Sequence, residues 1–496
     1  MTNLQSLNFF IPEIILVITV IAALITDLFL KKSKTDFIGW VLGIGLIVVA
    51  LATINLRHVA PTTLFMDMIV IDPFSSFIKL VIILSTLLVI IASWNNDELK
   101  SYRKGEYFTI MGIMVLGLFL MASSIDIIML YLSIEIVSIM SFILAGYLKL
   151  DTRSNEAGLK YVIYSAFSSG IMLFGLSIVY GLTGSTNYFD IQESIVALDS
   201  TANPALVMGM LMIFAGFGYK ISAVPFHFWT PDVYEGSPTT ITAYLSVAPK
   251  AAGFAMIIRF FHQVFSDSYA LSSNLIGSTD MPWPEIIGLL AVATMTLGNL
   301  VAIQQVSIKR MLAYSSIAHA GYMMLALPVI SIDAIEAIMI YLFVYLFMNL
   351  GAFFIVITVK NKTGGETFDD YKGLGWEMPF VGSVMTLFML SLTGLPPTAG
   401  FVGKLYIFKT LIGAGNSYYW LVVAGGINSV ISLYYYFHVV KVMFLDGKRS
   451  DKIIQPPAPM FGLLLVSAIP SLFLGVYWNP LISWVKESLV FYTQTL

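Results

Sequence analysis

Several ionisable side chains stand inside apolar runs that are long enough to cross a bilayer. The deepest of them are Glu135, Lys220, Lys250 and Lys404. A charge at the bilayer centre costs roughly 2.5–3.5 kcal/mol on insertion scales, so charged groups at that depth usually serve a function. Apolar surroundings favour the neutral form of a lysine, whereas a nearby carboxylate favours its charged form. A lysine whose carboxylate partner comes and goes can therefore bind and release a proton.

Glu135 and Lys220 fit this chemistry best. Glu135 lies in the middle of the run LYLSIEIV at 130–137, and Lys220 precedes Pro225 with further apolar residues between them. We interpret Glu135 as a proton carrier that pairs with a lysine of another helix. The structural alternative is an ion pair that only fixes how two helices pack. For Lys220 the alternative is a side chain that reaches along its stem to the membrane surface.

Lys250 and Lys404 are the next candidates, because both follow helix-breaking residues at membrane depth. Lys250 follows Pro249 near the middle of a predicted helix, and Lys404 follows the run Gly394-Leu395-Pro396-Pro397. We expect both to carry protons.

His319, His227 and Lys160 have competing structural explanations of equal weight. A neutral histidine can relay a proton through its two ring nitrogens, but a hydrogen-bonded core histidine is the alternative for both histidines. Lys160 is expected near the cytoplasmic end of its helix, where it either modulates Glu135 or is simply interfacial.

Other charges and aromatic residues receive a structural interpretation. Lys79, Arg259 and Lys441 stand close enough to helix ends for their charged heads to reach the membrane surface. The run Tyr434-Tyr435-Tyr436 is expected to pack or to line an interface rather than to bind a cofactor.

The elements that carry these residues are predicted to be membrane helices. The chain has 496 residues, of which 58% are hydrophobic and 11% charged, whereas a soluble protein has about 25% charged residues. We predict an all-α polytopic membrane protein with about fourteen helices of about 20 residues each. A short interfacial helix is predicted over 480–493. The predicted membrane helices cover 9–30, 37–56, 73–94, 106–123, 125–148, 158–181, 203–226, 239–262, 284–305, 311–328, 334–359, 378–413, 417–444 and 458–478.

Composition also excludes several kinds of site. The chain has no cysteine, which excludes disulfides and iron–sulfur ligation by cysteine. Its five histidines show no metal-ligand spacing. The apolar stretch 9–30 lacks the flanking features of a signal peptide, so we expect it to be the first membrane helix.

Lysine and arginine collect in alternate loops, which predicts that these loops face the cytoplasm. Loops 182–202 and 263–283 contain neither residue. An even number of crossings then puts both termini outside. Loop 227–238 is an exception, because it should be cytoplasmic but has no basic residue. The basic loops contain Lys31, Lys32 and Lys34; Lys100, Arg103 and Lys104; Lys149 and Arg153; Lys309 and Arg310; Lys360, Lys362 and Lys372; Lys448, Arg449 and Lys452.

Recurring residues indicate an internal repeat. At offsets of 181 to 184 residues, Leu116-Gly117 recurs as Leu297-Gly298 and Lys220 recurs as Lys404. The unit holds five helices, helices 4–8 and then 9–13, and an odd number inverts the second copy relative to the first. The predicted single membrane domain thus comprises three N-terminal helices in 1–104, a first inverted repeat in 105–265, a second in 284–446 and a C-terminal helix in 447–496.

Each copy contains an interrupted helix in the corresponding place. The first interruption is predicted at 216–220 with Pro225 beyond it, and the second at 394–400. Proline removes a backbone donor and clashes with the preceding turn. Such a break survives at membrane depth only inside protein or beside a wet cavity. Paired breaks therefore predict a transport site near the midplane.

Three runs resemble one known family. They are GYKISAVPFHFWTPDVYEGSPT at 218–239, KRMLAYSSIAH at 309–319 and GLPPTAGF at 394–401. They are similar to the antiporter-like membrane subunits of complex I, the proton-pumping NADH–quinone oxidoreductase, and the resemblance covers essentially the whole chain. The wording PDVYEG and SVAPK favours the N-type subunits. Lys404 stands where M-type subunits are expected to have glutamate, and the long lateral helix expected of L-type subunits is missing.

The resemblance implies a role for each main candidate. Glu135 would be the paired acid of helix 5 and Lys220 the central lysine of broken helix 7. Lys250 would link to the second half-channel, and Lys404 would pass the proton outside. His319 and His227 match family positions whose roles are less secure.

The resemblance also implies the setting of the chain. It would be a proton-translocating subunit of respiratory complex I in a bacterial inner membrane, with both termini in the periplasm. It would bind no cofactor, since NADH, FMN, iron–sulfur clusters and quinone are expected elsewhere in the complex. Its partners would be neighbouring antiporter-like and small hydrophobic subunits and the lipid bilayer, not nucleic acid.

Two alternatives from other classes stay open. One is a subunit of a multisubunit cation/proton antiporter, whose large subunits share this repeat. The other is a scaffold in which the helices brace neighbouring subunits and the buried charges are structural.

Overall fold

The computed structural model describes residues 3–31, 35–198, 203–272, 283–329, 331–447 and 453–490. Within these ranges thirteen helices are long and apolar enough to cross a membrane, or up to fourteen when a bent pair is counted as one span. The prediction of an all-α polytopic membrane protein with about fourteen helices is confirmed. The basic residues Lys32, Lys34, Lys448, Arg449 and Lys452, and residues 273–282 of the loop predicted at 263–283, lie outside the described residues.

The N-terminal part of the chain forms three long helices and a small hairpin. Strand β1 pairs antiparallel with β2, with Thr62 opposite Ile71. The hairpin was not predicted, because strands of three residues show too little alternation to be recognised. The elements are α1 (Asn3–Ser6), α2 (Ile11–Phe29), α3 (Asp36–Leu56), β1 (Thr62–Leu64), β2 (Ile69–Ile71) and α4 (Pro73–Trp94).

The first five-helix unit follows after the 3-10 helix η2 (Asp97–Leu99). Its predicted spans are all present, and α8 is an additional helix in the loop predicted at 182–202. The elements are α5 (Lys104–Ser123), α6 (Ile127–Ala145), α7 (Thr152–Thr183), α8 (Tyr188–Ala197), α9 (Asn203–Ile221), α10 (Trp229–Gly236) and α11 (Thr239–Ser272).

The second unit is followed by two C-terminal helices. Helix α20 covers most of the predicted 480–493 segment and packs on α4 and α14, with the Trp484 ring 4.6 Å from that of Phe77. The elements are α12 (Trp283–Ala302), α13 (Ile308–Met324), η4 (Leu327–Val329), α14 (Ile332–Thr363), η5 (Phe368–Tyr371), α15 (Leu374–Glu377), α16 (Pro379–Thr393), α17 (Ala399–Gly413), η6 (Asn416–Tyr418), α18 (Tyr419–Phe444), α19 (Ala458–Val476) and α20 (Asn479–Leu489).

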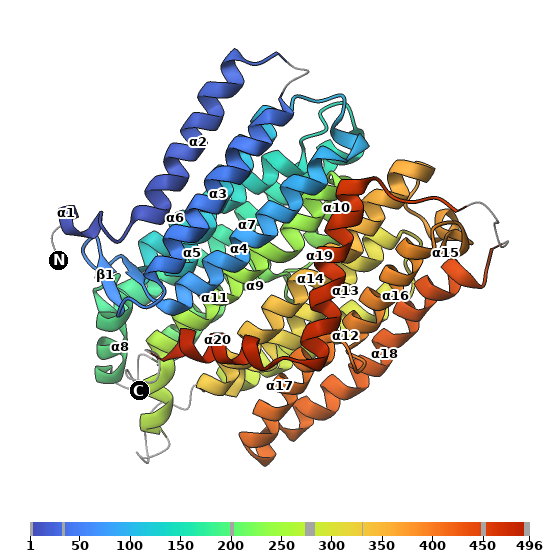
Figure 1. Ribbon diagram of the computed structural model, residues 1–496. Helices are drawn as coiled ribbons and strands as arrows, with labels where there is room; N and C mark the ends of the chain where they lie inside the picture. The colour runs from blue at the N-terminus through green and yellow to red at the C-terminus, as the bar shows by residue number, and fades with distance from the viewer. Residues whose placement is uncertain are drawn as a thin grey trace.

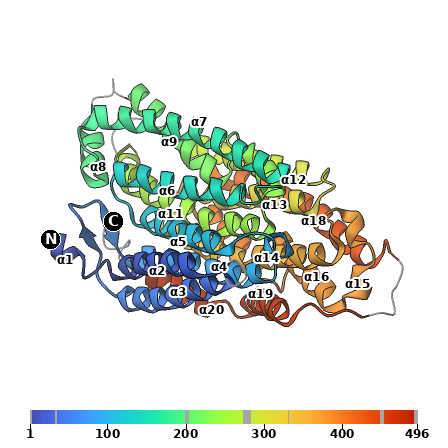
Figure 2. The ribbon, with the colours of Figure 1, turned by 90° about the horizontal axis from the view of Figure 1, so that it is seen from above.

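Helices α11 and α14 form the centre of the bundle (Figures 1 and 2). Almost all residues of their spans are buried, whereas α2, α3 and α18 are largely exposed at the periphery. A helix that is apolar all round is expected to be buried all round. The loops on the side where α2 starts carry α1, the hairpin, α8, η4 and η6, and we call this side the N-terminal face. The opposite face carries η2, η5 and α15.

Matching backbone contacts confirm the repeat. In each unit, residues just before the second helix form a β-bridge with residues just after the third helix. The bridges are Asp126 with Asn187 and Ser307 with Thr367, so the two copies are offset by 181 and 180 residues. An odd number of crossings separates the two contacts, so the first lies at the N-terminal face and the second at the opposite face. The second unit is therefore inverted. The matching hydrogen bonds are Ile127 N to Thr186 O with Tyr188 N to Ile125 O, and Ile308 N to Glu366 O with Phe368 N to Val306 O.

The first break lies after Lys220, not across 216–220 as predicted. Helix α9 continues through Gly216 to Ile221, and the chain becomes helical again at Trp229. A Cβ at Gly216 would lie 2.3 Å from the Met172 sulfur on α7. This glycine therefore allows two helices to pack closely and does not break α9. The freed amide of Val224 donates to Thr294 Oγ1 on α12 at 3.0 Å, so a side chain of another helix satisfies this donor of the break.

The second break lies inside the span predicted at 378–413. Helix α16 ends at Thr393, followed by Gly394 with a φ of 86°, and α17 begins at Ala399. A Cβ at Gly400 would lie only 1.8 Å from the carbonyl oxygen of Ser391. Only glycine allows the start of α17 to approach the end of α16 this closely. The predicted pair of interrupted helices is confirmed.

Candidate functional site

Lys220 occupies the last turn of α9, directly before the first break. Its side chain is 2% exposed, and its Nζ atom donates to Ser138 Oγ on α6 at 3.3 Å. The break thus leaves Lys220 at the buried end of a half-helix, in contact with the neighbouring helix that also carries Glu135.

Glu135 lies one turn before Ser138 on α6 and is half-buried. Its carboxylate accepts a hydrogen bond from the Ser169 hydroxyl of α7, and the same hydroxyl lies 3.3 Å from the Tyr131 hydroxyl. The predicted direct pair with a lysine is not formed among the described residues. Instead, Glu135 and Lys220 contact different serine hydroxyls, those of Ser169 and Ser138.

Lys250 is buried in the middle of α11, next to Pro249. Its Nζ atom donates to the carbonyl oxygen of Ser316 at 2.6 Å and to the Ser316 hydroxyl at 2.7 Å. That hydroxyl also accepts from Tyr345 at 2.9 Å. Lys250 therefore connects the last helix of the first unit with α13 and α14 of the second.

His319 lies between two tyrosine hydroxyls. Its Nδ1 atom is 2.7 Å from Tyr341 Oη on α14, and its Nε2 atom is 3.0 Å from Tyr436 Oη on α18. The imidazole and Tyr345 rings are 5.1 Å apart, which places His319 beside the Lys250 contact. A histidine with hydrogen bonds at both nitrogens is suited to relay a proton.

Lys404 lies on α17, beyond the second break. Its Nζ atom donates to the carbonyl oxygen of Thr393 at 2.8 Å and to Ser429 Oγ at 3.2 Å. It also lies 4.2 Å from the centre of the Tyr322 ring. The last carbonyls of a helix lack intrahelical donors and carry a partial negative charge. The end of half-helix α16 is therefore a favourable site for an ammonium group.

Polar side chains of α12, α13 and α18 link the surroundings of His319 with those of Lys404. Tyr435 donates to Asn299 Oδ1 at 2.9 Å, and the Tyr435 and Tyr436 rings are 4.3 Å apart. Ser429 donates to the Tyr322 hydroxyl at 3.3 Å. Imidazole, hydroxyl and amine groups that share hydrogen bonds can exchange protons by switching donor and acceptor roles.

The sequence did not distinguish the members of the tyrosine run. Tyr434 is 65% exposed, whereas Tyr435 and Tyr436 are buried. The expectation that the run packs rather than binds a cofactor did not identify these two hydroxyls as part of the network. Asn299 was also missed, although a buried asparagine in a membrane helix is a signal for a polar interhelical contact.

Lys160 has no hydrogen bond or ion pair, in the described part of the chain, with the residues discussed above from Glu135 to Lys404. Helix α7 begins at Thr152, capped by Asp151, so Lys160 lies in its third turn rather than at its start as predicted. It pairs with Asp232 at 2.6 Å and with Glu156 at 2.7 Å, not with Glu135. Asp232 also pairs with Arg310 at 2.7 Å. The acidic loop 227–238 is thus neutralised by basic residues of neighbouring helices.

His227 is also separate from the buried lysines. Its ring lies against Phe228 at 4.4 Å, and its Nδ1 atom has no hydrogen-bond partner among the described residues. Of the two histidines, the geometry favours His319 as a relay.

Two buried ion pairs were not predicted. Lys79 pairs with Glu13 at 2.6 Å, and Arg259 makes two hydrogen bonds of 3.0 Å to Asp72. The expectation that these basic groups reach the membrane surface is wrong, because a carboxylate on a neighbouring segment provides a buried partner for each. The acids Glu13 and Asp72, which stand next to apolar runs, were the sequence signal that could have predicted these pairs. Lys441, in contrast, is 58% exposed.

A further charged cluster lies at the opposite face. Glu98 pairs with Lys360 at 2.8 Å and accepts from the backbone N–H of Thr239 at 2.7 Å. Burial raises the pKa of Glu98, but the positive charges of Lys309 and Lys360 more than offset this and bring it to about 2. The cluster joins η2 to the helices of both units.

Comparison with known proteins shows which family has this arrangement of two interrupted helices. The family described as "NADH:quinone oxidoreductase/Mrp antiporter, TM" matches residues 124–432, which span both breaks. The chain belongs to this family of antiporter-like membrane proteins.

Relatives narrow the class further. "NADH-quinone oxidoreductase subunit N 2" of Chloroherpeton thalassium is 45% identical over 487 residues, covering 97% of this chain and 94% of that protein. The chain is thus a member of the subunit N family of NADH-quinone oxidoreductase, as the N-type resemblance indicated.

Solved structures share the fold over almost the whole chain. A chain of "Respiratory complex I from Thermus thermophilus with bound Aureothin" has a TM-score of 0.77 and 26% identity, covering 95% of this chain and 98% of that one. A chain of the Mrp complex from Dietzia sp. DQ12-45-1b has a TM-score of 0.81 and 17% identity, covering 99% of both chains. Both neighbours are chains of multisubunit membrane complexes.

Proposed function

We propose that this chain translocates protons across the membrane as a subunit of a proton-pumping NADH–quinone oxidoreductase. The observation that carries the proposal is the row of three buried lysines, Lys220, Lys250 and Lys404, each hydrogen-bonded to a serine hydroxyl. Lysines are costly at membrane depth. Three of them, next to two helix breaks and a histidine with two polar partners, fit a path for protons better than a scaffold.

The first half of the path would begin at Glu135. An opposite charge close to a lysine favours the ammonium form, and its withdrawal favours release of the proton. Glu135 and Ser138 lie one turn apart on α6, so movement of the Lys220 side chain from the Ser138 hydroxyl toward Glu135 would exchange a hydroxyl contact for an ion pair. Such an exchange would load and unload Lys220.

The second half would run from Lys250 to Lys404. No direct hydrogen bond joins Lys220 to Lys250 in the described part of the chain, so this transfer requires a side-chain rotation or an intervening water. From Lys250 the contacts continue through Ser316 and Tyr345 to His319, and then through the tyrosine network to Lys404. The exposed ends of α17 and α18 give an exit at the N-terminal face.

The proposal includes the setting of the chain. Electron transfer from NADH to quinone would take place in other subunits, and this chain would convert the coupled change into proton movement. The membrane would be a bacterial inner membrane, and the basic loops support an orientation with the N-terminal face in the periplasm.

Purification tests this function directly. The tagged chain, extracted in mild detergent, is expected to co-purify with flavin- and iron–sulfur-containing partners. Membrane vesicles are expected to show proton uptake that depends on NADH-driven quinone reduction. Recovery with small hydrophobic subunits alone, together with sodium-dependent proton flux without NADH, would instead establish a cation/proton antiporter. This alternative is tested because the family description names the Mrp antiporter as well as the oxidoreductase, and because a chain of an Mrp complex shares the fold.

A further inference from the structure

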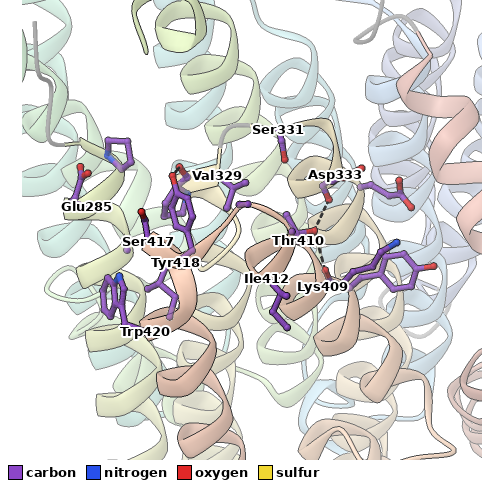
Figure 3. A pocket seen from close by; sticks show the side chains of 18 of the residues that line it. Glu285, Val329, Ser331, Asp333, Lys409, Thr410, Ile412, Ser417, Tyr418 and Trp420 are labelled. Atoms are coloured by element: carbon purple, nitrogen blue, oxygen red, sulfur yellow. Dashed lines mark hydrogen bonds between the residues drawn. The ribbon is translucent and has the colours of Figure 1, made fainter. Parts of the chain in front are cut away.

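A large pocket opens at the N-terminal face, beyond Lys404. Its volume is about 930 Å³, and it is lined by residues near the ends of α12, α14, α17 and α18, by η4 and η6, and by Lys486 of α20. Figure 3 shows Asp333 and Lys409 toward one side of the pocket and Glu285 and Trp420 toward the other. We call it the outer pocket. None of the seven candidates predicted from the sequence lines it.

Glu336 is the unusual residue of the outer pocket. It lines the pocket from the first turns of α14 and is only 7% exposed. No hydrogen bond or ion pair joins its carboxylate to another residue of the described chain, although Lys409 and Lys486 line the same pocket. A buried carboxylate without a partner is costly. The site therefore favours a cation or a proton.

The three chain segments around Lys404 continue toward the outer pocket. One layer holds Lys404 of α17, Tyr322 of α13 and Ser429 of α18, which contact one another. Two turns further along each chain segment toward the N-terminal face, the pocket is lined by Ile412 of α17, Val329 of η4, which follows α13, and Leu421 of α18. At these three positions one turn of chain lies between the Lys404 layer and the pocket, whereas Tyr406 of α17 lines the pocket closer to Lys404 in the sequence.

That intermediate turn is apolar and tightly packed. It contributes Phe408 from α17, Leu325 directly after α13, and Gly425 from α18. A Cβ at Gly425 would lie 2.6 Å from the Phe408 ring and 3.2 Å from Leu325 Cδ1. The two side chains thus meet over a glycine that leaves them room. We call this layer the apolar plug, and it lies between the Lys404 layer and the pocket residues Ile412, Val329 and Leu421.

We propose that the outer pocket is the proton outlet of this chain, that Glu336 accepts the proton there, and that Phe408 and Leu325 gate the transfer. The proposal rests on the function proposed above, since it takes Lys404 as the donor. When the plug opens, the Lys404 ammonium gives its proton through water to the Glu336 carboxylate. Lys404 becomes a neutral amine and Glu336 a carboxylic acid. Glu336 then releases the proton to water outside and regains its charge.

The absence of cysteine makes the plug directly testable, because an engineered cysteine is the only thiol in the chain. The experiment uses the whole complex in membrane vesicles and a membrane-impermeant thiol reagent. Val329→Cys reports on the pocket, and Ser432→Cys reports on the buried side of the plug. Asn155→Cys, exposed at the opposite face, is the orientation control.

Val329→Cys is expected to react from the side opposite to that of Asn155→Cys. Ser432→Cys is expected to stay unlabelled while Phe408 is present, and to react roughly tenfold faster or more with Phe408→Ala added, a change that corresponds to about 1.4 kcal/mol in opening. Equal labelling of Ser432→Cys with and without Phe408 would refute the plug. Labelling of Val329→Cys and Asn155→Cys from the same side would refute the outlet.

Glu336→Gln tests the acceptor, with Glu285→Gln at the exposed rim of the same pocket as the matched control. NADH-driven proton transfer is expected to fall below roughly a tenth of the wild-type rate with Glu336→Gln and to stay unchanged with Glu285→Gln. If Lys404→Ala abolishes proton transfer but Glu336→Gln does not, the outlet is wrong and the proposed function stands. If Lys404→Ala also leaves proton transfer intact, the proposed function itself fails.

Discussion

The ammonium group of Lys404 lies over the face of Tyr322, with Nζ 4.2 Å from the ring centre. A cation over an aromatic ring gains about 2 kcal/mol or more when both groups are desolvated. The ring therefore helps to hold a charge that the membrane interior would otherwise disfavour. We expect Tyr322→Leu to slow NADH-driven proton transfer more than Tyr322→Phe does, because phenylalanine keeps the ring. Equal effects of the two substitutions would show that the hydroxyl, not the ring, matters.

The His319 contacts lead to a second prediction. Tyr436→Phe removes the hydroxyl that lies 3.0 Å from Nε2 while keeping the ring. A lost hydrogen bond worth about 1–1.5 kcal/mol corresponds to roughly tenfold slower transfer. The rate of proton uptake by vesicles measures the effect, and Tyr434→Phe on the exposed side is the control. A normal rate in the Tyr436→Phe complex would remove Tyr436 from the path.

The ion pair between Glu13 and Lys79 predicts a non-additive effect on stability. Removing one partner of a buried pair costs roughly 3–5 kcal/mol, whereas replacing both with apolar residues is often neutral. Glu13→Leu and Lys79→Met are each expected to lower the melting temperature of the complex in mild detergent. The double variant is expected to recover most of the loss. Additive losses in the double variant would argue against the pair, and Lys441→Met serves as an exposed control.

Glu98 predicts a defined dependence of stability on pH. Its pKa is about 2 in the folded chain against an ordinary value of 4.5, so its charge stabilises the fold above pH 4.5. That contribution, about 3 kcal/mol at most, is lost as the pH falls from 4.5 toward 2. At pH 7, Glu98→Gln is expected to melt at a lower temperature than the wild type. The difference should shrink on acidification below pH 4.5, and a difference that grows would contradict the assignment.

The sequence was sufficient to predict the helices and the deep lysines. Apolar runs of membrane length have few alternative structures. A lysine inside such a run, such as Lys404 after Pro396-Pro397, is too far from the helix ends to reach the membrane surface easily. The repeat offset could be read from the sequence because both copies keep equivalent residues, such as Lys220 and Lys404, in register.

The contacts between side chains of different helices could not be predicted, because the sequence does not show which helices are neighbours. Lys79 resembles a lysine that reaches the surface until α2 brings Glu13 beside it. Tyr434 and Tyr435 are adjacent in the chain but point to different sides of α18. Tyr434 is exposed at the periphery, whereas Tyr435 is buried in the hydrogen-bond network. Glu336 lies near a helix end, where an acid is ordinary, and only the pocket around it reveals that it is buried.

The most direct test of proton translocation by this chain is the proton-to-electron ratio of a complex that carries Lys220→Ala. The complex must be fully assembled and must still oxidise NADH, and Lys441→Ala provides a complex with an exposed lysine removed. We expect Lys220→Ala to nearly abolish proton translocation while Lys441→Ala keeps the wild-type ratio. A normal ratio in the assembled Lys220→Ala complex would contradict the proposed function.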